Sequence, residues 1–345
     1  DLSDDVIQII RKLIRFKFGF DPNKANCTDA AVQLCLEHQF DPVLDYLDAL
    51  VWDGKPRLDS WLSTYLGAVT NPLNSAFSRL SLIGAVRRAR KPGTKFDQII
   101  ALEGPEGKGK SESVEILAGK ENFSDQTILG KTDKEQQEAM CGIWLYEISD
   151  LSGMRRAEIE HVKAFASRTT DRARPAYGRF RVDRPRRTVF FATTNRDDYL
   201  QSDTGNRRFW PVMTGIISTA ALRADRDQLW AEAAAREAKG ETHILDPRLW
   251  KVAAEEQDKR FATDEWTVPI QNYLSLKAKD KEDFSIFEIL TDNQFLQILP
   301  AQVRRAEEMR AGSIMRRLGW TKFRKRCADG TLAWRYRRSG GESSS

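Results

Sequence analysis

The sequence has little that would support a disulfide-stabilised or metal-centred protein. Its 345 residues include only four cysteines, and none of them has C-x-x-C spacing. This usage indicates reduced thiols and a cytosolic setting. Cys35 and His38 lie one helical turn apart, but no second pair of ligands follows them. A packed helix face is therefore favoured over a zinc site.

Long apolar runs and targeting signals are also missing. No apolar stretch approaches the length needed to cross a bilayer, and the first residues lack a signal-peptide pattern. We therefore expect no membrane partner. The chain begins at Asp1 rather than Met, so we expect a piece of a longer protein or a trimmed form of one. The net charge of +5 is too small to argue for nucleic acid by itself, so the distribution of charge matters more.

The most informative stretch is the glycine-rich run GPEGKGKS, which satisfies G-x-x-x-x-G-K-[ST]. It follows an apolar run at 99–102 that is typical of a buried parallel strand, and it precedes a helical pattern at 114–118 closed by Gly119. A strand, a glycine-rich loop and a helix in this order predict a P-loop. The predicted nucleotide-binding residues are Gly104, Pro105, Glu106, Gly107, Lys108, Gly109, Lys110, Ser111 and Glu112.

The residue types of this loop suit a triphosphate. Glycines let consecutive backbone N–H groups point at a phosphate, and the helix N-terminus adds partial positive charge. Lys110 is predicted to neutralise the β- and γ-phosphates, and Ser111 to bind Mg²⁺. ATP and Mg²⁺ are therefore the expected ligands. The competing interpretation is a glycine loop that only turns the chain.

Three further pieces follow the loop in order along the chain. Glu147 ends an apolar strand pattern, with Asp150 three residues later, and Asn195 ends a second such pattern. An arginine pair, Arg207 and Arg208, comes soon after. An NTPase needs a carboxylate for the metal or the attacking water, a polar group to orient that water, and a cation for the γ-phosphoryl charge. Each piece is weak alone, but the ordered set favours an ATPase.

The most basic part of the chain lies between these strand patterns. Residues 177–182 alternate, 183–185 are predicted to turn the chain, and 187–195 to leave it as a core strand. Clustered arginines on such a hairpin would bind DNA phosphates without regard to sequence. The competing interpretation is a solvated charged loop. The candidate DNA-binding residues are Arg179, Arg181, Arg184 and Arg186.

The composition predicts four regions. Residues 1–74 are expected to be helical, with Asp41 as an N-cap before Pro42, and residues 75–262 to form the ATPase core. Residues 263–338 predict three helices and a basic hairpin around Asp329-Gly330, which describes a winged helix, and 339–345 read as a disordered tail. The wing could bind duplex DNA, or it could serve packing or subunit contact. Its cations are Lys322, Arg324, Lys325, Arg326, Arg335, Arg337 and Arg338.

Taken together, these stretches resemble the virulence-associated protein E family, phage- and plasmid-type ATPase domains related to the superfamily 3 helicases of the AAA+ class. The resemblance implies an α/β fold with an AAA+ type P-loop NTPase core, between an N-terminal helical region and a C-terminal winged-helix-like domain. It covers about residues 38–215. The stretches that carry it are 38–62, 87–111, 142–151, 174–195 and 199–212.

The resemblance also implies roles for single residues. Lys110 and Ser111 take the P-loop roles, Glu147 the acidic-strand role and Asn195 the sensor role. Arg208 matches the arginine finger that reaches a neighbouring subunit's ATP; Arg207 is the alternative finger, or a second sensor. Related helicases often have two adjacent acids at the strand end, whereas here Asp150 follows Glu147 after two other residues. Either Glu147 binds the metal while Asp150 acts as the base, or Glu147 does both.

The function implied is that of an ATP-dependent DNA helicase or translocase of a mobile genetic element. We expect a homo-oligomeric, hexameric ring in the cytoplasm of a bacterium or phage-infected cell, with the basic hairpin gripping single-stranded DNA in its pore. A primase or an initiator is an expected partner. The alternatives are an ATP-controlled assembly switch that binds DNA, and a regulatory or defence ATPase without unwinding activity.

Overall fold

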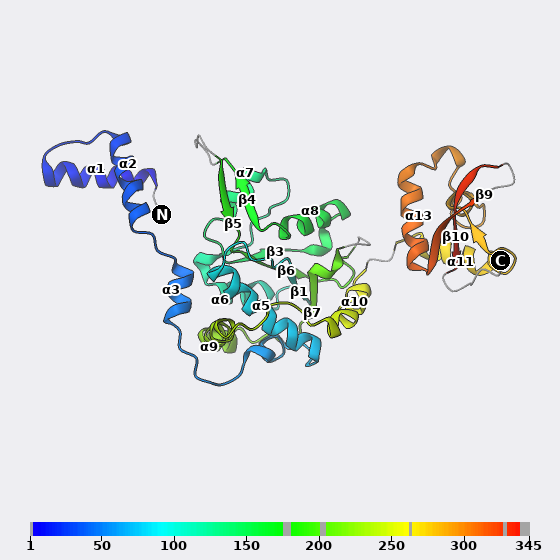
Figure 1. The fold of residues 1–345 in the computed structure, drawn as a ribbon, viewed down its shortest axis with the longest axis horizontal. Helices are drawn as coiled ribbons and strands as arrows, with labels where there is room; N and C mark the ends of the chain where they lie inside the picture. The colour runs from blue at the N-terminus through cyan, green and yellow to red at the C-terminus, as the bar shows by residue number, and fades with distance from the viewer. Residues whose placement is uncertain (1–2, 175–180, 201–204, 262–263, 327–329, 339–345) are drawn as a thin grey trace.

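The computed structural model describes residues 3–174, 181–200, 205–261, 264–326 and 330–338. At its centre is a parallel sheet with the strand order β2-β3-β6-β1-β7 (Figure 1). The chain is thus a mixed α/β protein with a parallel central sheet, in keeping with the expected fold class. The strands are β1 (Ile99–Glu103), β2 (Phe123–Ser124), β3 (Leu145–Ile148), β6 (Val189–Thr194) and β7 (Phe209–Met213).

Helices cover both faces of this sheet. Successive side chains of a strand point to opposite faces, so Ile100 and Leu102 enter one apolar cluster while Ile99 and Ala101 enter another. The first cluster contains residues of α5 (Pro72–Arg90), α6 (Lys110–Ala118) and α9 (Thr219–Ala238), and the second contains residues of α8 (Arg156–Ala166). Burial on both faces explains why the strands are continuous apolar runs.

The N-terminal residues are helical, as expected. The helices are α1 (Asp4–Phe18), α2 (Lys24–Glu37), α3 (Pro42–Ala49) and α4 (Trp61–Leu66). Asp41 caps α3 by accepting hydrogen bonds from the backbone N–H groups of Val43 and Leu44, which confirms the predicted helix start. Within the described chain, no helix has the length and apolar character needed to cross a membrane.

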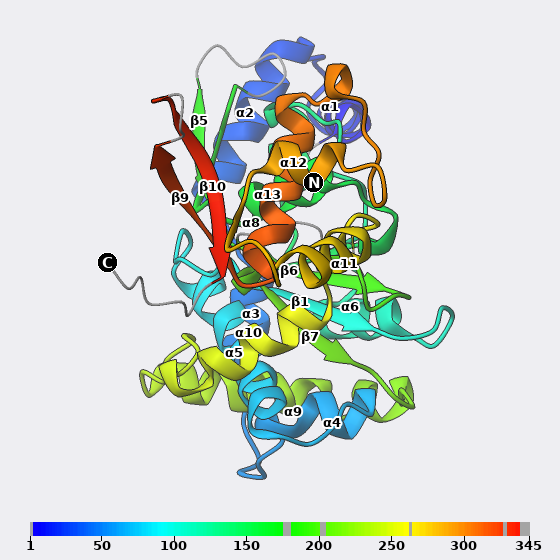
Figure 2. The same ribbon diagram turned by 90° about the vertical axis from the view of Figure 1, so that its right-hand side faces the viewer.

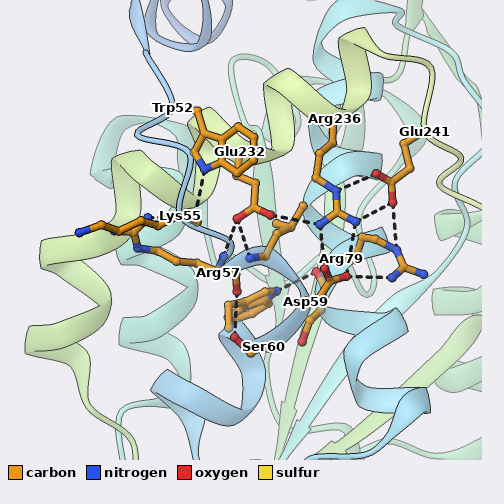
Figure 3. A network of polar contacts seen from close by, with 12 residues as sticks. Trp52, Lys55, Arg57, Asp59, Ser60, Arg79, Glu232, Arg236 and Glu241 are labelled. Atoms are coloured by element: carbon orange, nitrogen blue, oxygen red, sulfur yellow. Dashed lines mark hydrogen bonds and ion pairs between the residues drawn. The ribbon is translucent and has the colours of Figure 1, made fainter.

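The segment between α3 and α4 is attached to α9 by a network of charged groups (Figure 3). The buried carboxylate of Glu232 accepts hydrogen bonds from the backbone N–H groups of Arg57, at 2.6 Å, and Leu58, at 2.8 Å. Arg236 of α9 donates to Asp59 at 2.8 Å and to Glu241 at 2.9 Å. These contacts give the polar residues of this stretch a structural role.

The basic hairpin differs from the prediction. Strand β4 (Thr170–Ala173) pairs antiparallel with β5 (Val182–Pro185), so residues 183–185 belong to a strand and do not turn the chain. The turn expected there is wrong. The strand that pairs with β5 is β4, which precedes it in the chain. Two contacts hold β5 there: Arg186 forms a buried ion pair with Asp171, and the Arg186 backbone N–H donates to Thr169 O at 2.8 Å. Residues 175–180 lie outside the described residues.

The C-terminal residues form a separate apolar cluster beneath a second sheet, with the strand order β8-β10-β9. Figure 2 shows α13 beside the long β9–β10 ribbon. Three helices and a hairpin match the predicted order of elements, and β8 adds a third strand. The elements are α11 (Thr267–Lys277), β8 (Asp283–Phe284), α12 (Ile286–Thr291), α13 (Arg305–Arg317), β9 (Trp320–Arg326) and β10 (Leu332–Arg338). Asp329, in the predicted turn, lies outside the described residues.

Candidate functional site

A pocket of about 430 Å³ lies at the carboxyl ends of β1, β3 and β6. Ligands of open α/β sheets bind at this edge. The loop between β1 and α6 forms one wall, and Glu147, Asp150 and Asn195 form the other. Residues predicted from three separate stretches of the sequence therefore line one cavity.

The loop needs its glycines. Gly104, Gly107 and Gly109 have φ values of 146°, 70° and 91°, which side-chain-bearing residues rarely adopt. A Cβ on Gly104 would lie 2.6 Å from Thr214 Oγ1. The Gly104 N–H donates to Thr194 O at 3.2 Å, which ties the start of the loop to the end of β6. The tight curve leads directly into α6, whose first residue is Lys110.

Lys110 points back into the loop. Its Nζ donates to the carbonyl oxygens of Gly104 and Pro105, each at 2.7 Å, and the residue is 8% exposed. Burial lowers the pKa of this ammonium group. The hydrogen bonds of the ammonium group thus go to neutral carbonyl oxygens, which a phosphate would replace with a stronger partner.

Glu147 joins β3 to the loop. Its Oε1 accepts hydrogen bonds from Ser111 Oγ at 2.7 Å and Thr193 Oγ1 at 2.6 Å, and the residue is 1% exposed. Its Oε2 is buried and has no partner among the described residues. A buried carboxylate oxygen without a hydrogen-bond partner is costly, and a cation beside it would offset that cost. Carboxylate and hydroxyl oxygens are the donors that Mg²⁺ prefers, so Glu147 and Ser111 fit this metal.

Asp150 and Asn195 form a second polar group in the pocket. Ser152 Oγ lies 2.5 Å from Asp150 Oδ1 and 3.0 Å from Asn195 Oδ1. Asp150 is exposed and has a φ of 51°, so the chain bends sharply here to bring its side chain toward β6. Ser152 and Thr193 were not predicted. Thr193 precedes Asn195 by two positions, so the alternation of the strand could have identified it.

Arg207 and Arg208 lie at the amino ends of the parallel strands, whereas the pocket lies at their carboxyl ends. Phe209 of β7 pairs with Ile99 at the start of β1, so Arg207 and Arg208 are separated from their own loop by a strand of roughly 13 Å. Arg208 Nε donates to Asp97 Oδ2 at 3.1 Å and to Ser167 Oγ at 2.7 Å. Arg207 is exposed and forms no hydrogen bond or ion pair within the described part of the chain.

The candidate DNA-binding arginines are not equivalent. Arg186 is 2% exposed, and its guanidinium is paired with Asp171 and lies 4.2 Å from the Phe165 ring centroid. Its assignment to DNA is wrong, because the side chain holds β5 to α8. Arg181 and Arg184 are exposed on the hairpin. Arg179 lies outside the described residues.

A buried charged group beneath the loop was not predicted from the sequence. Glu103, the residue before Gly104, is fully buried and accepts hydrogen bonds from Tyr199 Oη and Arg260 Nη2, both at 2.8 Å. Burial and the nearby carboxylate raise the pKa of Tyr199 well above its usual value. The sequence feature that could have identified this group is the glutamate at the end of an otherwise apolar strand. The group fastens the C-terminal end of α10 (Trp250–Lys259) to the base of the loop.

Comparison with known sequences gives one family. A sequence model described as the virulence-associated protein E-like domain matches residues 47–262, more than half of the chain. A search of curated proteins finds no match.

Solved structures give weaker likenesses. An apo structure of the NrS-1 C-terminal region (305–718) has a TM-score of 0.47 and 11% identity, and the match covers 85% of this chain and 78% of that one. Two A-form apo structures of the same region have TM-scores of 0.46 and 0.45 and identities of 11% and 13%, with the same coverage. Likenesses at this level carry no information about activity.

Proposed function

Since the chain belongs to the virulence-associated protein E-like family, in keeping with the resemblance in its sequence, we propose that it is a Mg²⁺-dependent ATPase that acts on DNA during replication of a mobile genetic element. In this proposal residues 75–262 are an AAA+ type P-loop core of the superfamily 3 kind, and residues 263–338 are a winged-helix-like domain. Residues 1–74 form the helical region that precedes the core.

The buried oxygen of Glu147 is the observation that carries this proposal. Its Oε1 already binds Ser111 and Thr193, whereas its Oε2 has no partner among the described residues. Mg²⁺ held by Glu147 and Ser111 would neutralise charge on the β- and γ-phosphates of ATP. The oxygens of a buried carboxylate with only a structural role usually have hydrogen-bond partners.

The remaining polar groups of the pocket then have distinct roles. Lys110 exchanges two loop carbonyls for phosphate oxygens, with which a cation interacts more strongly. Asp150 and Asn195, joined through Ser152, orient the attacking water, and Asp150 takes its proton. Glu147 is then left to the metal. Of the two alternatives, we therefore propose the one in which the two carboxylates have separate tasks.

The arginine finger is assigned to Arg207 and not to Arg208. Arg208 is 21% exposed and is bound to Asp97 and Ser167 of its own chain. Arg207 is exposed next to it on the same turn. Neither lies near its own loop, so Arg207 acts on ATP bound by a neighbouring copy, as in a hexameric ring. Arg208 positions the turn that presents Arg207.

The β4–β5 hairpin is proposed to contact single-stranded DNA through Arg181 and Arg184. One observation favours the assembly switch as a second candidate. Asp183 lies 3.5 Å from Arg181 and 3.4 Å from Arg172, so part of the positive charge of the hairpin is cancelled. A weaker grip suits a protein that closes on DNA without moving along it. A primase or an initiator is the expected partner in either case.

The test is ATP hydrolysis with and without single-stranded DNA, followed by unwinding of a forked duplex. Lys110→Ala should abolish hydrolysis, whereas Lys120→Ala, whose exposed side chain lies outside the pocket, should retain it. DNA-stimulated hydrolysis with unwinding identifies a helicase, and stimulation without unwinding a translocase. Hydrolysis that DNA does not change supports the switch or a regulatory ATPase. Near-normal hydrolysis by Lys110→Ala would refute the nucleotide site.

A further inference from the structure

The β9–β10 hairpin has two faces of different character. Directly paired residues of two antiparallel strands share a face, so Arg324 lies beside Trp334 on one face, and Phe323 lies beside Arg335 on the other. We name the first the Trp334 face. It consists of Lys322, Arg324, Arg326, Leu332 and Trp334. The buried side chain of Tyr336 anchors the inner end of this face to the C-terminal apolar cluster.

Two of the three cations of the opposite face, Lys325 and Arg335, are paired with carboxylates, and the third, Arg337, lies with its Cζ 5.1 Å from the Phe323 ring centroid. Asp283 of β8 accepts a hydrogen bond from Lys325 Nζ at 2.5 Å and forms an ion pair with Arg335. Glu288 of α12 adds a second carboxylate, 3.3 Å from Arg335 Nη1. A polyanion that approached this face would have to compete with two carboxylates that are already in place.

Among the residues that the structure describes, no ion pair places a carboxylate beside Lys322 or Arg324 on the Trp334 face. Trp334 is 50% exposed, and its ring centroid lies 4.5 Å from Lys322 Nζ and 4.8 Å from Arg324 Cζ. Within the described residues, neither cation forms an ion pair. The same pattern continues one pair further out, where Arg326 lies opposite Leu332, which is 60% exposed. An indole ring and two cations that form no ion pair with a described residue are thus presented together to solvent.

This chemistry selects the class of ligand. An acidic peptide would satisfy the cations and leave the indole ring in water. A duplex would offer phosphates, but its bases are hidden in their stack. Single-stranded nucleic acid offers both phosphates and unstacked bases, and aromatic rings flanked by cations bind it through stacking and charge. We propose that the Trp334 face binds single-stranded nucleic acid, and this proposal does not depend on the nucleotide site.

The experiment measures the affinity of the full chain for a fluorescent 20-nucleotide oligo-dT, without ATP, by anisotropy. All variants carry Arg181→Gln and Arg184→Gln, so that the β4–β5 hairpin contributes little. Trp334→Ala should weaken binding about tenfold, and Trp334→Phe should restore most of it. Lys322→Gln with Arg324→Gln should lower the slope of log affinity against log salt by about 1.4. The matched control is Lys325→Gln with Arg337→Gln, which removes two charges from the opposite face and should retain the affinity and most of the slope.

Two results would overturn the proposal. If Trp334→Ala binds as tightly as its parent while the Lys322 and Arg324 variant loses duplex and single-stranded DNA equally, the face contacts phosphates without stacking. If the control pair loses as much as the Lys322 and Arg324 pair, only net charge matters. Circular dichroism of Trp334→Ala checks the fold, and the Trp334→Phe variant keeps the test decisive if the alanine variant unfolds. An oligo-rU arm tells RNA from DNA, and tight binding of either supports the proposal.

Discussion

Burial distinguishes Glu147, which lies within β3, from Asp150, which follows that strand. Glu147 is almost fully buried and bonded to two hydroxyls, whereas Asp150 is exposed and reaches Asn195 through Ser152. A buried carboxylate with one oxygen unpaired suits a metal, and an exposed one suits proton transfer to and from water. Glu147 and Asp150 are only three positions apart in the sequence, but one carboxylate is buried and the other is exposed.

Replacing Glu147 by Gln should preserve ATP binding and lower kcat strongly, because the amide is a poor ligand for Mg²⁺. The measurements are steady-state ATP hydrolysis and the affinity for a fluorescent ATP analogue. Asp150→Asn is the comparison, and it should lower kcat while the Mg²⁺ dependence of nucleotide binding stays normal. If Asp150→Asn shifts the Mg²⁺ dependence and Glu147→Gln does not, the two roles are reversed.

Among the elements, the β4–β5 hairpin combines structure with function. Its inner end is fastened by the buried Arg186–Asp171 pair, and its exposed cations, Arg181 and Arg184, belong to the strand and its approach. One element therefore contains arginines that hold it in place and arginines that face solvent. The two groups should respond to mutation in different assays.

Arg181→Gln combined with Arg184→Gln should weaken binding of single-stranded DNA and lower the salt slope by about 1.4, since each phosphate contact contributes about 0.7. Hydrolysis of ATP without DNA should stay normal, because the hairpin lies outside the pocket. The measurement is anisotropy across a salt series. An unchanged slope would leave these arginines as a solvated charged surface.

Arg186→Ala should instead lower the free energy of unfolding by about 3–5 kcal/mol, because it leaves Asp171 buried without its partner. Arg184→Ala, on the same hairpin but exposed, should change it by less than about 0.5 kcal/mol. Urea denaturation followed by circular dichroism measures both. A small effect of Arg186→Ala would mean that Asp171 is satisfied without the arginine.

In the molecule as a whole, the parallel sheet places the loop and Arg207 at opposite edges. The loop follows the carboxyl end of β1, whereas Arg207 precedes the amino end of the parallel strand β7. One chain therefore cannot bring the loop and Arg207 to the same nucleotide. If Arg207 takes part in hydrolysis, a second copy must supply it. Assembly would then be a condition of activity and not only of DNA binding.

Arg207→Ala should bind ATP and lose about 10³- to 10⁵-fold of its turnover, the usual effect of a missing finger. Mixed with Lys110→Ala, it should regain activity wherever an intact Arg207 faces an intact loop. Arg208→Ala should lose thermal stability, and its activity should fall less than that of Arg207→Ala. If Lys110→Ala restores activity when mixed with Arg208→Ala but not when mixed with Arg207→Ala, the finger is Arg208. If neither variant loses turnover, the ring model is wrong for this chain.

The sequence alone determined the parts that depend on neighbours along the chain. The loop at 104–111, the strands before Glu147 and Asn195, and the cap at Asp41 are specified by local spacing and backbone preferences. These could be predicted because a turn, a helix start or a buried strand needs particular residues within a few positions.

Only the tertiary structure decided which polar groups are buried and what they contact. The hairpin register, the burial of Arg186 and the unpaired oxygen of Glu147 depend on residues that are not neighbours in the sequence. The Glu103–Arg260 pair joins two residues that are 157 positions apart. Arginines of one basic segment look alike in the sequence, and their partners distinguish them. A charged side chain acquires its role from what surrounds it, because burial and pairing set the free energy of its charge.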